Sequence, residues 1–249
     1  MHALSRGRLH FSGPGRAAVL FVHGGFHGAW CWSETTDFLA SRGIATAAID
    51  LRGHGGLSPD DSFLEDGVDA MTQDVIEAMR VAPVPFLAGH SLGALIAMKA
   101  AGLLPLRGLI LLAPAPPAGI SRAHPLPRFP AGRAVQPPDA TRARKWFMSG
   151  ATAPDMARYL AQLCPESPRL LNESFHEGVA IERASINCPI LCLSGGKDDS
   201  PLHPAGQDQA IAAHYGATLK VVEASGHSMM IDDGREETAS AIHIWIAGQ

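Results

Sequence analysis

A serine flanked by two glycines stands at a predicted junction between a strand and a helix. The pentapeptide Gly89-His90-Ser91-Leu92-Gly93 directly follows the apolar run Pro85 to Ala88 and directly precedes an amphipathic segment, Leu92 to Leu103. A turn this tight leaves no room for a side chain at either glycine, and it projects the serine hydroxyl above the sheet at a helix N-terminus. Ser91 is therefore predicted to be a nucleophile that attacks a carbonyl carbon.

A serine hydroxyl is a weak nucleophile at neutral pH and needs a positioned base. His227 follows the apolar run Thr218 to Val222 and precedes a predicted terminal helix. Of the other histidines, His203 is the main alternative because it lies close after Asp198 and Asp199, which are candidates for the acid. His90 is fixed within the pentapeptide, and the remaining histidines considered fall in helical patterns (His214, His243) or before the core (His2, His10). We predict that His227 is the base.

The base in turn needs a carboxylate that holds its ring. Asp198 and Asp199 follow the predicted strand Pro189 to Leu193, so a carboxylate is available at the carboxyl end of a neighbouring strand. Two adjacent aspartates cannot both face His227. The spacing from the strand end favours Asp198, and Asp199 remains the alternative.

Acyl transfer from a serine also needs backbone N–H groups that stabilise an oxyanion. A loop rich in glycine, His23 to Trp30, follows the apolar run Ala18 to Val22. The predicted donors are the amides of Gly25 and Leu92, with Phe26 as second choice. His23 and His27 lie on this loop rather than on a helix, and no third ligand is evident, so we predict neither a metal site nor a cofactor.

The remaining candidates concern substrate binding. Phe26, His90, Trp146 and Met229 are predicted to contact the substrate. Further aromatic and methionine side chains are open to two interpretations, pocket lining or ordinary core packing, and these are Trp30, Trp32, Phe147 and Met148. The segment Asp50 to Gly55 is predicted to form a turn beside these loops without a catalytic role.

Most of the apolar runs carry apolar residues at consecutive positions, which is typical of strands buried on both faces in a parallel sheet. Segments of helical length separate them, so a doubly wound, mostly parallel α/β fold is predicted. The predicted strands cover residues 18–22, 44–49, 85–88, 109–112, 189–193 and 218–222, and the helices 30–42, 63–80, 92–103, 204–215 and 234–246.

Residues 117–187 interrupt this alternation, because 71 residues are too many for a simple crossover. The segment holds nine of the 19 prolines and two helical patterns, 141–148 and 155–163. Its net charge is +3, which leaves −7 for the rest of the chain. We predict a hydrolytic core of residues 1–116 and 188–249 with an inserted helical lid of residues 117–187, whose charge would suit an anionic substrate or an acidic carrier.

Composition excludes several classes of protein. The 249 residues carry a formal charge of −4, with 46% hydrophobic and 18% charged residues, a profile of a globular chain without affinity for nucleic acid or membranes. No signal-peptide pattern is present, and the four cysteines (Cys31, Cys164, Cys188 and Cys192) form no metal-binding spacing. We expect a cytoplasmic monomer or homodimer with reduced cysteines.

These motifs resemble the α/β-hydrolase superfamily from about Arg8 to the C-terminus, and within it the plant methyl esterase and hydroxynitrile lyase group. The resemblance implies that Ser91, Asp198 and His227 form a catalytic triad and that the Gly25 and Leu92 amides form the oxyanion hole. Hydroxynitrile lyases of this group carry a lysine after the catalytic histidine and a threonine where Gly24 stands. Ser228 follows His227 here, which favours ester hydrolysis over cyanohydrin cleavage.

The sequence therefore predicts a serine hydrolase that cleaves a small-molecule carboxylic ester or thioester through an acyl-enzyme on Ser91. One alternative is a thioesterase, acyltransferase or cyclase of a biosynthetic pathway that acts on a group bound to an acyl carrier protein. An alternative of another class is a ligand-binding module that uses the same fold without catalysis.

Overall fold

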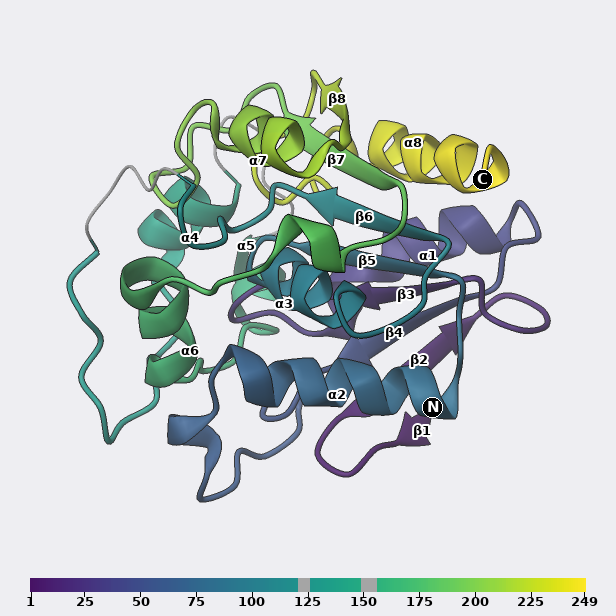
Figure 1. Ribbon diagram of the computed structural model, residues 1–249. Coiled ribbons are helices and arrows are strands. Elements are labelled where there is room, and N and C mark those ends of the chain that lie inside the picture. Colours follow the sequence, from purple (N-terminus) through teal and green to yellow (C-terminus); the bar gives the residue numbers. More distant parts are fainter. Residues whose placement is uncertain (121–125, 149–155) are drawn as a thin grey trace.

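The computed structural model describes residues 1–120, 126–148 and 156–249, and within them the chain forms a sheet of eight strands in the order β1-β2-β4-β3-β5-β6-β7-β8 (Figure 1). Every neighbouring pair from β4 to β8 is parallel, whereas β1 and β2 are antiparallel. The predicted mostly parallel α/β fold is confirmed. The bounds are β1 His2–Ala3, β2 Arg8–Ser12, β3 Val19–Val22, β4 Thr46–Asp50, β5 Phe86–His90, β6 Gly108–Leu112, β7 Ile190–Gly195 and β8 Thr218–Val222.

Helices cover both faces of the sheet (Figure 1). One apolar cluster contains α2 (Val68–Val81), α3 (Leu92–Ala101) and α7 (Gln207–Tyr215), and a second contains α1 (Ser33–Ala40) and α8 (Arg235–Ala247). The strands that lie between these two layers are apolar on both sides because both sides are buried. Among the described residues, no helix combines the length and apolar character that a membrane span requires.

Residues 117–187 leave the sheet after β6 and return to it at β7. Figure 1 shows their helices grouped at one end of the sheet, where the parallel strands end. The described helices are α4 (Ala140–Phe147), α5 (Met156–Leu160), α6 (Pro168–Asn172), a π-helical turn (Glu173–Glu177) and a 3-10 turn (Arg183–Ser185). The first two match the predicted helical patterns, although α5 ends earlier than predicted and Asp155 lies outside the described residues.

Local capping explains where two helices of this insertion begin. The Asp139 side chain accepts a hydrogen bond from the Arg142 N–H at the start of α4, and Ser167 does the same for Leu170 at the start of α6. Pro168 then occupies the first turn of α6, where a missing N–H costs nothing. Two further 3-10 turns, Ala29–Trp32 and Phe63–Glu65, contact the insertion, the first through Trp30 against Tyr159 of α5 and the second against α6.

Candidate active site

Ser91 lies in a strained turn between β5 and α3. Its φ of 50° and ψ of −118° are unusual for a residue with a side chain, a strain that is common at functional turns. A Cβ atom at Gly89 would lie 2.7 Å from the Ala94 nitrogen, and one at Gly93 would lie 2.6 Å from the Val22 oxygen. Both glycines are therefore required by contact with the neighbouring backbone, as the pentapeptide predicts.

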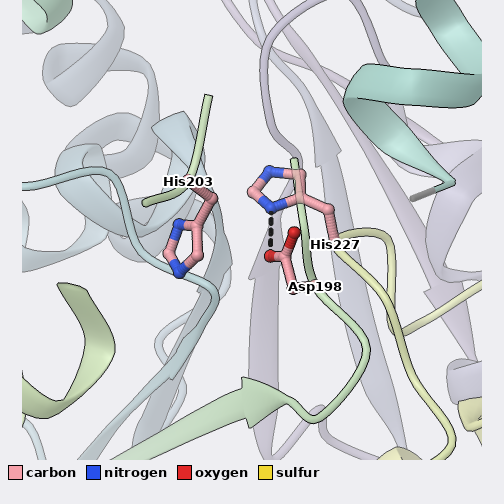
Figure 2. Close-up of side chains that lie close together, drawn as sticks. All are labelled: Asp198, His203 and His227. Carbon is pink, nitrogen blue, oxygen red and sulfur yellow. Dashed lines mark hydrogen bonds and ion pairs between the residues drawn. The ribbon is translucent and has the colours of Figure 1, made fainter. Parts of the chain in front are cut away.

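His227 lies between Ser91 and Asp198, and Figure 2 shows its ring facing the Asp198 carboxylate. The Ser91 hydroxyl is 3.1 Å from Nε2 of His227, and Nδ1 of His227 donates to Oδ2 of Asp198 at 2.8 Å. The Ser200 N–H donates to the other Asp198 oxygen at 3.0 Å. Burial alone would raise the pKa of Asp198, but the His227 ring and the other donors hold it below its ordinary value. This geometry can move a proton from the serine hydroxyl to an imidazole backed by a carboxylate.

Asp199 and His203, the alternative acid and base, have surroundings that differ from those of Asp198 and His227. Asp199 is exposed, whereas the Asp198 side chain is buried against His227. His203 is also buried, but its Nε2 is 2.9 Å from an oxygen of Asp208, and Gln207 donates to its Nδ1 at 3.0 Å. Both ring nitrogens of His203 are thus engaged away from Ser91.

Asp198, His203 and His227 also bring three potential metal ligands within 4.8 Å of one another (Figure 2). A metal ion there would have to displace the bond between His227 and Asp198 and the bond between His203 and Asp208. The hydrogen bond of His227 and the ion pair of His203 thus already engage these ligand atoms.

Of the two predicted oxyanion donors, Leu92 directly follows Ser91 in the chain and Gly25 lies in the loop after β3. The Leu92 amide belongs to the first turn of α3, where N–H groups have no partner within the helix. The Phe26 amide, the second choice at the sequence level, donates to Oε2 of Glu166 at 3.1 Å and is thereby occupied. Gly25 lines the same cavity as Ser91 and Leu92. The geometry therefore favours the Gly25 and Leu92 amides over that of Phe26.

Two further histidines of the site are neutral. His90 donates from Nε2 to the backbone oxygen of His227 at 2.9 Å, and burial together with His227 lowers the pKa of His90 well below its ordinary value. His27 donates from Nδ1 to the Gly25 oxygen at 2.7 Å and accepts from the Tyr159 hydroxyl at 2.7 Å. Burial lowers the pKa of His27 to about 4. These rings act as fixed hydrogen-bonding groups.

A cavity of about 430 Å³ opens at Ser91 and His227. Phe26, His90 and Trp146, three of the predicted substrate contacts, line it, as does Phe147. The inserted segment supplies most of the other walls, which are largely apolar and comprise Leu126, Phe129, Val135, Pro137, Pro138, Leu171 and Phe175. The exposed side chains of Asp139 and Arg142 add two charges to the lining. The cavity thus suits a mainly apolar ligand of moderate size.

The other candidates for this cavity lie elsewhere. Met229 is fully buried in the apolar cluster of α1 and α8, because the turn after His227 directs it into the core rather than toward Ser91. Trp32 packs on Phe21 in the same cluster, with ring centroids 4.7 Å apart. Trp30 lines a separate cavity beside β2 and α1, and Met148 is buried in the other apolar cluster.

Sequence reasoning did not find Glu166 or Tyr159, which contact residues 23–30 from the insertion. Because this loop carries the predicted donor Gly25, we call it the oxyanion loop. Glu166 accepts from Phe26, and Tyr159 donates to His27. A buried carboxylate between a cysteine, two prolines and a serine carries no pattern that marks it in the sequence. The only signal available was its place in a segment that must cover the carboxyl ends of the strands.

Comparison with known proteins agrees with this fold. Residues 19–241 match the model of the Alpha/beta hydrolase family, which is most of the chain. The chain belongs to this family. The strand order, the turn at Ser91 and the positions of Asp198 and His227 after β7 and β8 are those that an α/β hydrolase requires.

Individual relatives match only part of the chain. Mouse protein phosphatase methylesterase 1 is 38% identical over 115 residues, which are 42% of this chain and 29% of that protein. The Arabidopsis thaliana pFDCC methylesterase MES16 is 35% identical over 77 residues, 30% of this chain and 29% of that protein. The matches thus span less than a third of these curated relatives.

Solved structures match over the whole fold. The Arabidopsis methylesterase MES16 superposes with a TM-score of 0.73 at 20% identity, covering 94% of this chain and all of that one. A putative aryl esterase from Burkholderia cenocepacia gives 0.74 at 20% identity, covering 97% and 94%. At this level of identity the likeness concerns the fold.

Proposed function

We propose that this α/β hydrolase cleaves a carboxylic ester through an acyl-enzyme on Ser91. The observation that carries the proposal is the series Ser91, His227 and Asp198, joined at 3.1 and 2.8 Å at the floor of an apolar cavity. A serine whose hydroxyl faces a carboxylate-backed imidazole is an activated nucleophile. A ligand-binding module would not need this alignment, so catalysis is the better explanation.

The reaction follows from the geometry in two halves. The Ser91 Oγ attacks the ester carbonyl carbon while His227 takes its proton, and the carbonyl oxygen becomes an oxyanion held by the Gly25 and Leu92 amides. Collapse of this intermediate breaks the bond to the leaving alcohol, which takes the proton from His227. Water then attacks the acyl-enzyme with His227 again as base, and the acid leaves with Ser91 restored. Asp198 stays ionised throughout and stabilises the imidazolium.

The substrate we propose is a small ester of an apolar acid. Apolar walls supplied by the inserted segment favour an acyl group of aromatic or short aliphatic character. The methylesterase and aryl esterase names of the relatives support a short alkyl or aryl leaving group. In this proposal residues 117–187 act as a lid that shapes the cavity over a core of residues 1–116 and 188–249.

Hydrolysis of p-nitrophenyl butyrate tests the proposal. Ser91→Ala removes the nucleophile, and we expect kcat/KM to fall by roughly 10³-fold or more, with the residual rate due to the oxyanion hole and binding. Ser62→Ala changes an exposed serine outside the cavity and serves as the matched control, with wild-type activity expected. A Ser91→Ala variant as fast as the wild type would overturn the assignment.

An acyl group bound to a carrier protein is a second candidate substrate, favoured by one observation. Arg142, Arg144 and Lys145 are exposed on α4, beside the cavity that Arg142 and Trp146 line. Such a basic face would attract an acidic carrier. Replacing Arg144 and Lys145, which lie outside the cavity lining, with glutamine should then slow hydrolysis of a butyryl group on an acyl carrier protein but not of butyryl-N-acetylcysteamine. Equal effects on both thioesters would count against carrier docking.

A further inference from the structure

Glu166 belongs to the inserted segment, yet its side chain is buried to 1% exposure at the oxyanion loop. Its Oε2 accepts the Phe26 N–H at 3.1 Å and lies 3.0 Å from Nε2 of His54. Its Oε1 accepts the N–H of Ser167 at 2.8 Å. Each oxygen of this carboxylate therefore has a defined donor, as a buried charge requires.

The bond from Phe26 fixes one end of a peptide group in the loop that contains Gly25. The other end of that peptide group is the Gly25 carbonyl, which accepts from His27 at 2.7 Å. The preceding peptide group carries the Gly24 carbonyl, which accepts from His23 at 2.8 Å, and at its other end the Gly25 N–H. Two successive peptide planes are thus held by side chains, and the second plane orients the predicted oxyanion donor.

Phe26 needs such support because of its backbone conformation. Its φ is 67°, in the left-handed region that costs energy for a residue with a large side chain. The insertion holds this residue at three points: the Glu166 carboxylate accepts its N–H, and the N–H and thiol of Cys164 donate to its carbonyl at 2.9 and 3.4 Å. The strained conformation is therefore maintained from outside the loop.

His54 places a ring nitrogen 3.0 Å from the buried Glu166 carboxylate. Its Nδ1 is 2.7 Å from the Arg52 carbonyl oxygen and its Nε2 faces the Glu166 carboxylate. Both partners only accept hydrogen bonds, so both ring nitrogens must donate, and the ring is an imidazolium. Burial alone would lower the pKa of His54, but Glu166 and, more weakly, Asp50 raise it. His23, whose ring centroid is 4.9 Å away, stays neutral beside this charge.

We propose that Glu166 is a positioning residue for catalysis: paired with His54, it holds the Phe26 N–H and thereby aims the Gly25 amide at the oxyanion. The inference rests on the proposed hydrolase function. It makes the oxyanion hole a shared product of the core and the insertion, since the loop comes from the core and its clamp from residues 164–167. Glu166 touches no reacting atom and acts only through the loop.

Glu166→Gln tests the proposal because it keeps the shape and removes the charge. A glutamine has one acceptor oxygen for the two backbone N–H groups, and its NH2 group would oppose one of them or His54. Glu173→Gln is the matched control: Glu173 also lies in the insertion, also accepts a backbone N–H of the core, that of Val68 at 2.7 Å, and lies outside the cavity.

For p-nitrophenyl butyrate we expect Glu166→Gln to lower kcat about 10- to 100-fold. Complete removal of an oxyanion donor lowers kcat about 10²- to 10³-fold, and here the donor is only misplaced. KM should stay within about threefold, because the loss concerns the transition state. Glu173→Gln should keep kcat within about twofold after correction for the folded fraction. If Glu166→Gln does not fold, Glu166→Asp replaces it under the same criterion.

Hydrogen exchange of a peptide covering residues 22–30 gives a readout that does not depend on activity. The Phe26 amide should exchange at least about tenfold faster in Glu166→Gln and unchanged in Glu173→Gln. Unchanged exchange with kcat within twofold of the wild type would overturn the proposal. A wild type that hydrolyses no ester, together with faster exchange in Glu166→Gln, would instead contradict the proposed function and leave the positioning role standing.

Discussion

Two buried pairs of a histidine and a carboxylate flank the oxyanion loop, and they differ in what the second ring nitrogen faces. His227 lies 2.8 Å from Asp198 and His54 lies 3.0 Å from Glu166, all with side chains no more than 3% exposed. The remaining nitrogen of His227 is 3.1 Å from the Ser91 hydroxyl, whereas that of His54 is 2.7 Å from a backbone carbonyl.

This difference separates a proton carrier from a fixed charge. A hydroxyl can both donate and accept, so the proton between Ser91 and His227 can move during a reaction. A carbonyl only accepts, so the proton on His54 stays in place and the ring remains a cation beside Glu166. In the proposed function the same two residue types thus serve chemistry in one pair and loop positioning in the other, and the third partner decides between them.

The largest effect should come from removing the proton carrier. We expect His227→Ala to lower kcat/KM for p-nitrophenyl butyrate by roughly 10⁴-fold or more, since nucleophile and base act as one unit. Steady-state kinetics with active-site concentration corrected for the folded fraction would measure it. A loss smaller than tenfold would show that another group, such as His203, takes the proton.

Removing the carboxylate that orients the carrier should cost somewhat less. Asp198→Asn should lower kcat by roughly 10³- to 10⁴-fold, because the amide favours the wrong tautomer of His227. Asp199→Asn changes the exposed neighbour by the same atoms and should leave kcat within about twofold. Equal losses in the two variants would contradict the assignment of the acid.

The fixed pair should matter more for stability than for chemistry. His54→Gln leaves the Glu166 carboxylate buried without a cation, which should lower the free energy of unfolding by about 3 to 5 kcal/mol. Any loss of kcat should be less than about 100-fold, since only the loop position is disturbed. Urea denaturation and steady-state kinetics of the same preparation would measure both effects. An unchanged unfolding free energy would indicate that His54 carries no charge.

Protonation of His27 should change stability by a smaller amount. Here the charged form of the ring is the destabilising one, because both of its hydrogen bonds require the neutral ring. Its pKa is lowered from 6.5 to about 4 in the folded state, so below pH 6.5 the unfolded chain binds a proton that the folded chain does not. Stability should therefore fall by roughly 2 to 3 kcal/mol as the pH drops from 6.5 to 4. His27→Gln cannot titrate and should lose less stability over this interval in urea denaturation. Parallel curves for the two proteins would contradict a neutral His27.

The fold was predictable where burial is complete on both sides. The runs at β3, β5, β6 and β7 are apolar because helices cover both faces, and their periodicity needs no knowledge of distant contacts. β2 escaped prediction because it is an antiparallel strand near the sheet edge with Arg8, His10 and Ser12 on its polar side. Two of them, Arg8 and His10, pair with Asp50 of β4, a contact that the sequence does not reveal.

The candidate site also has one part that could be predicted from the sequence and one part that could not. The proximity of Ser91 and His227 was predictable because each follows a recognisable strand and stands in a local motif. Glu166 was not, since its partners His54 and Phe26 are 112 and 140 residues away in sequence. The prediction for Met229 shows the converse, because proximity to His227 in sequence does not decide which way a side chain points.

Covalent labelling tests the central claim most directly. A fluorophosphonate reacts with a serine only when a working base activates it, and mass spectrometry locates the adduct. The account predicts one adduct per chain, on the peptide that carries Ser91, with labelling abolished in Ser91→Ala and strongly slowed in His227→Ala. A wild type that remains unlabelled, or labelling as fast in His227→Ala as in the wild type, would contradict it.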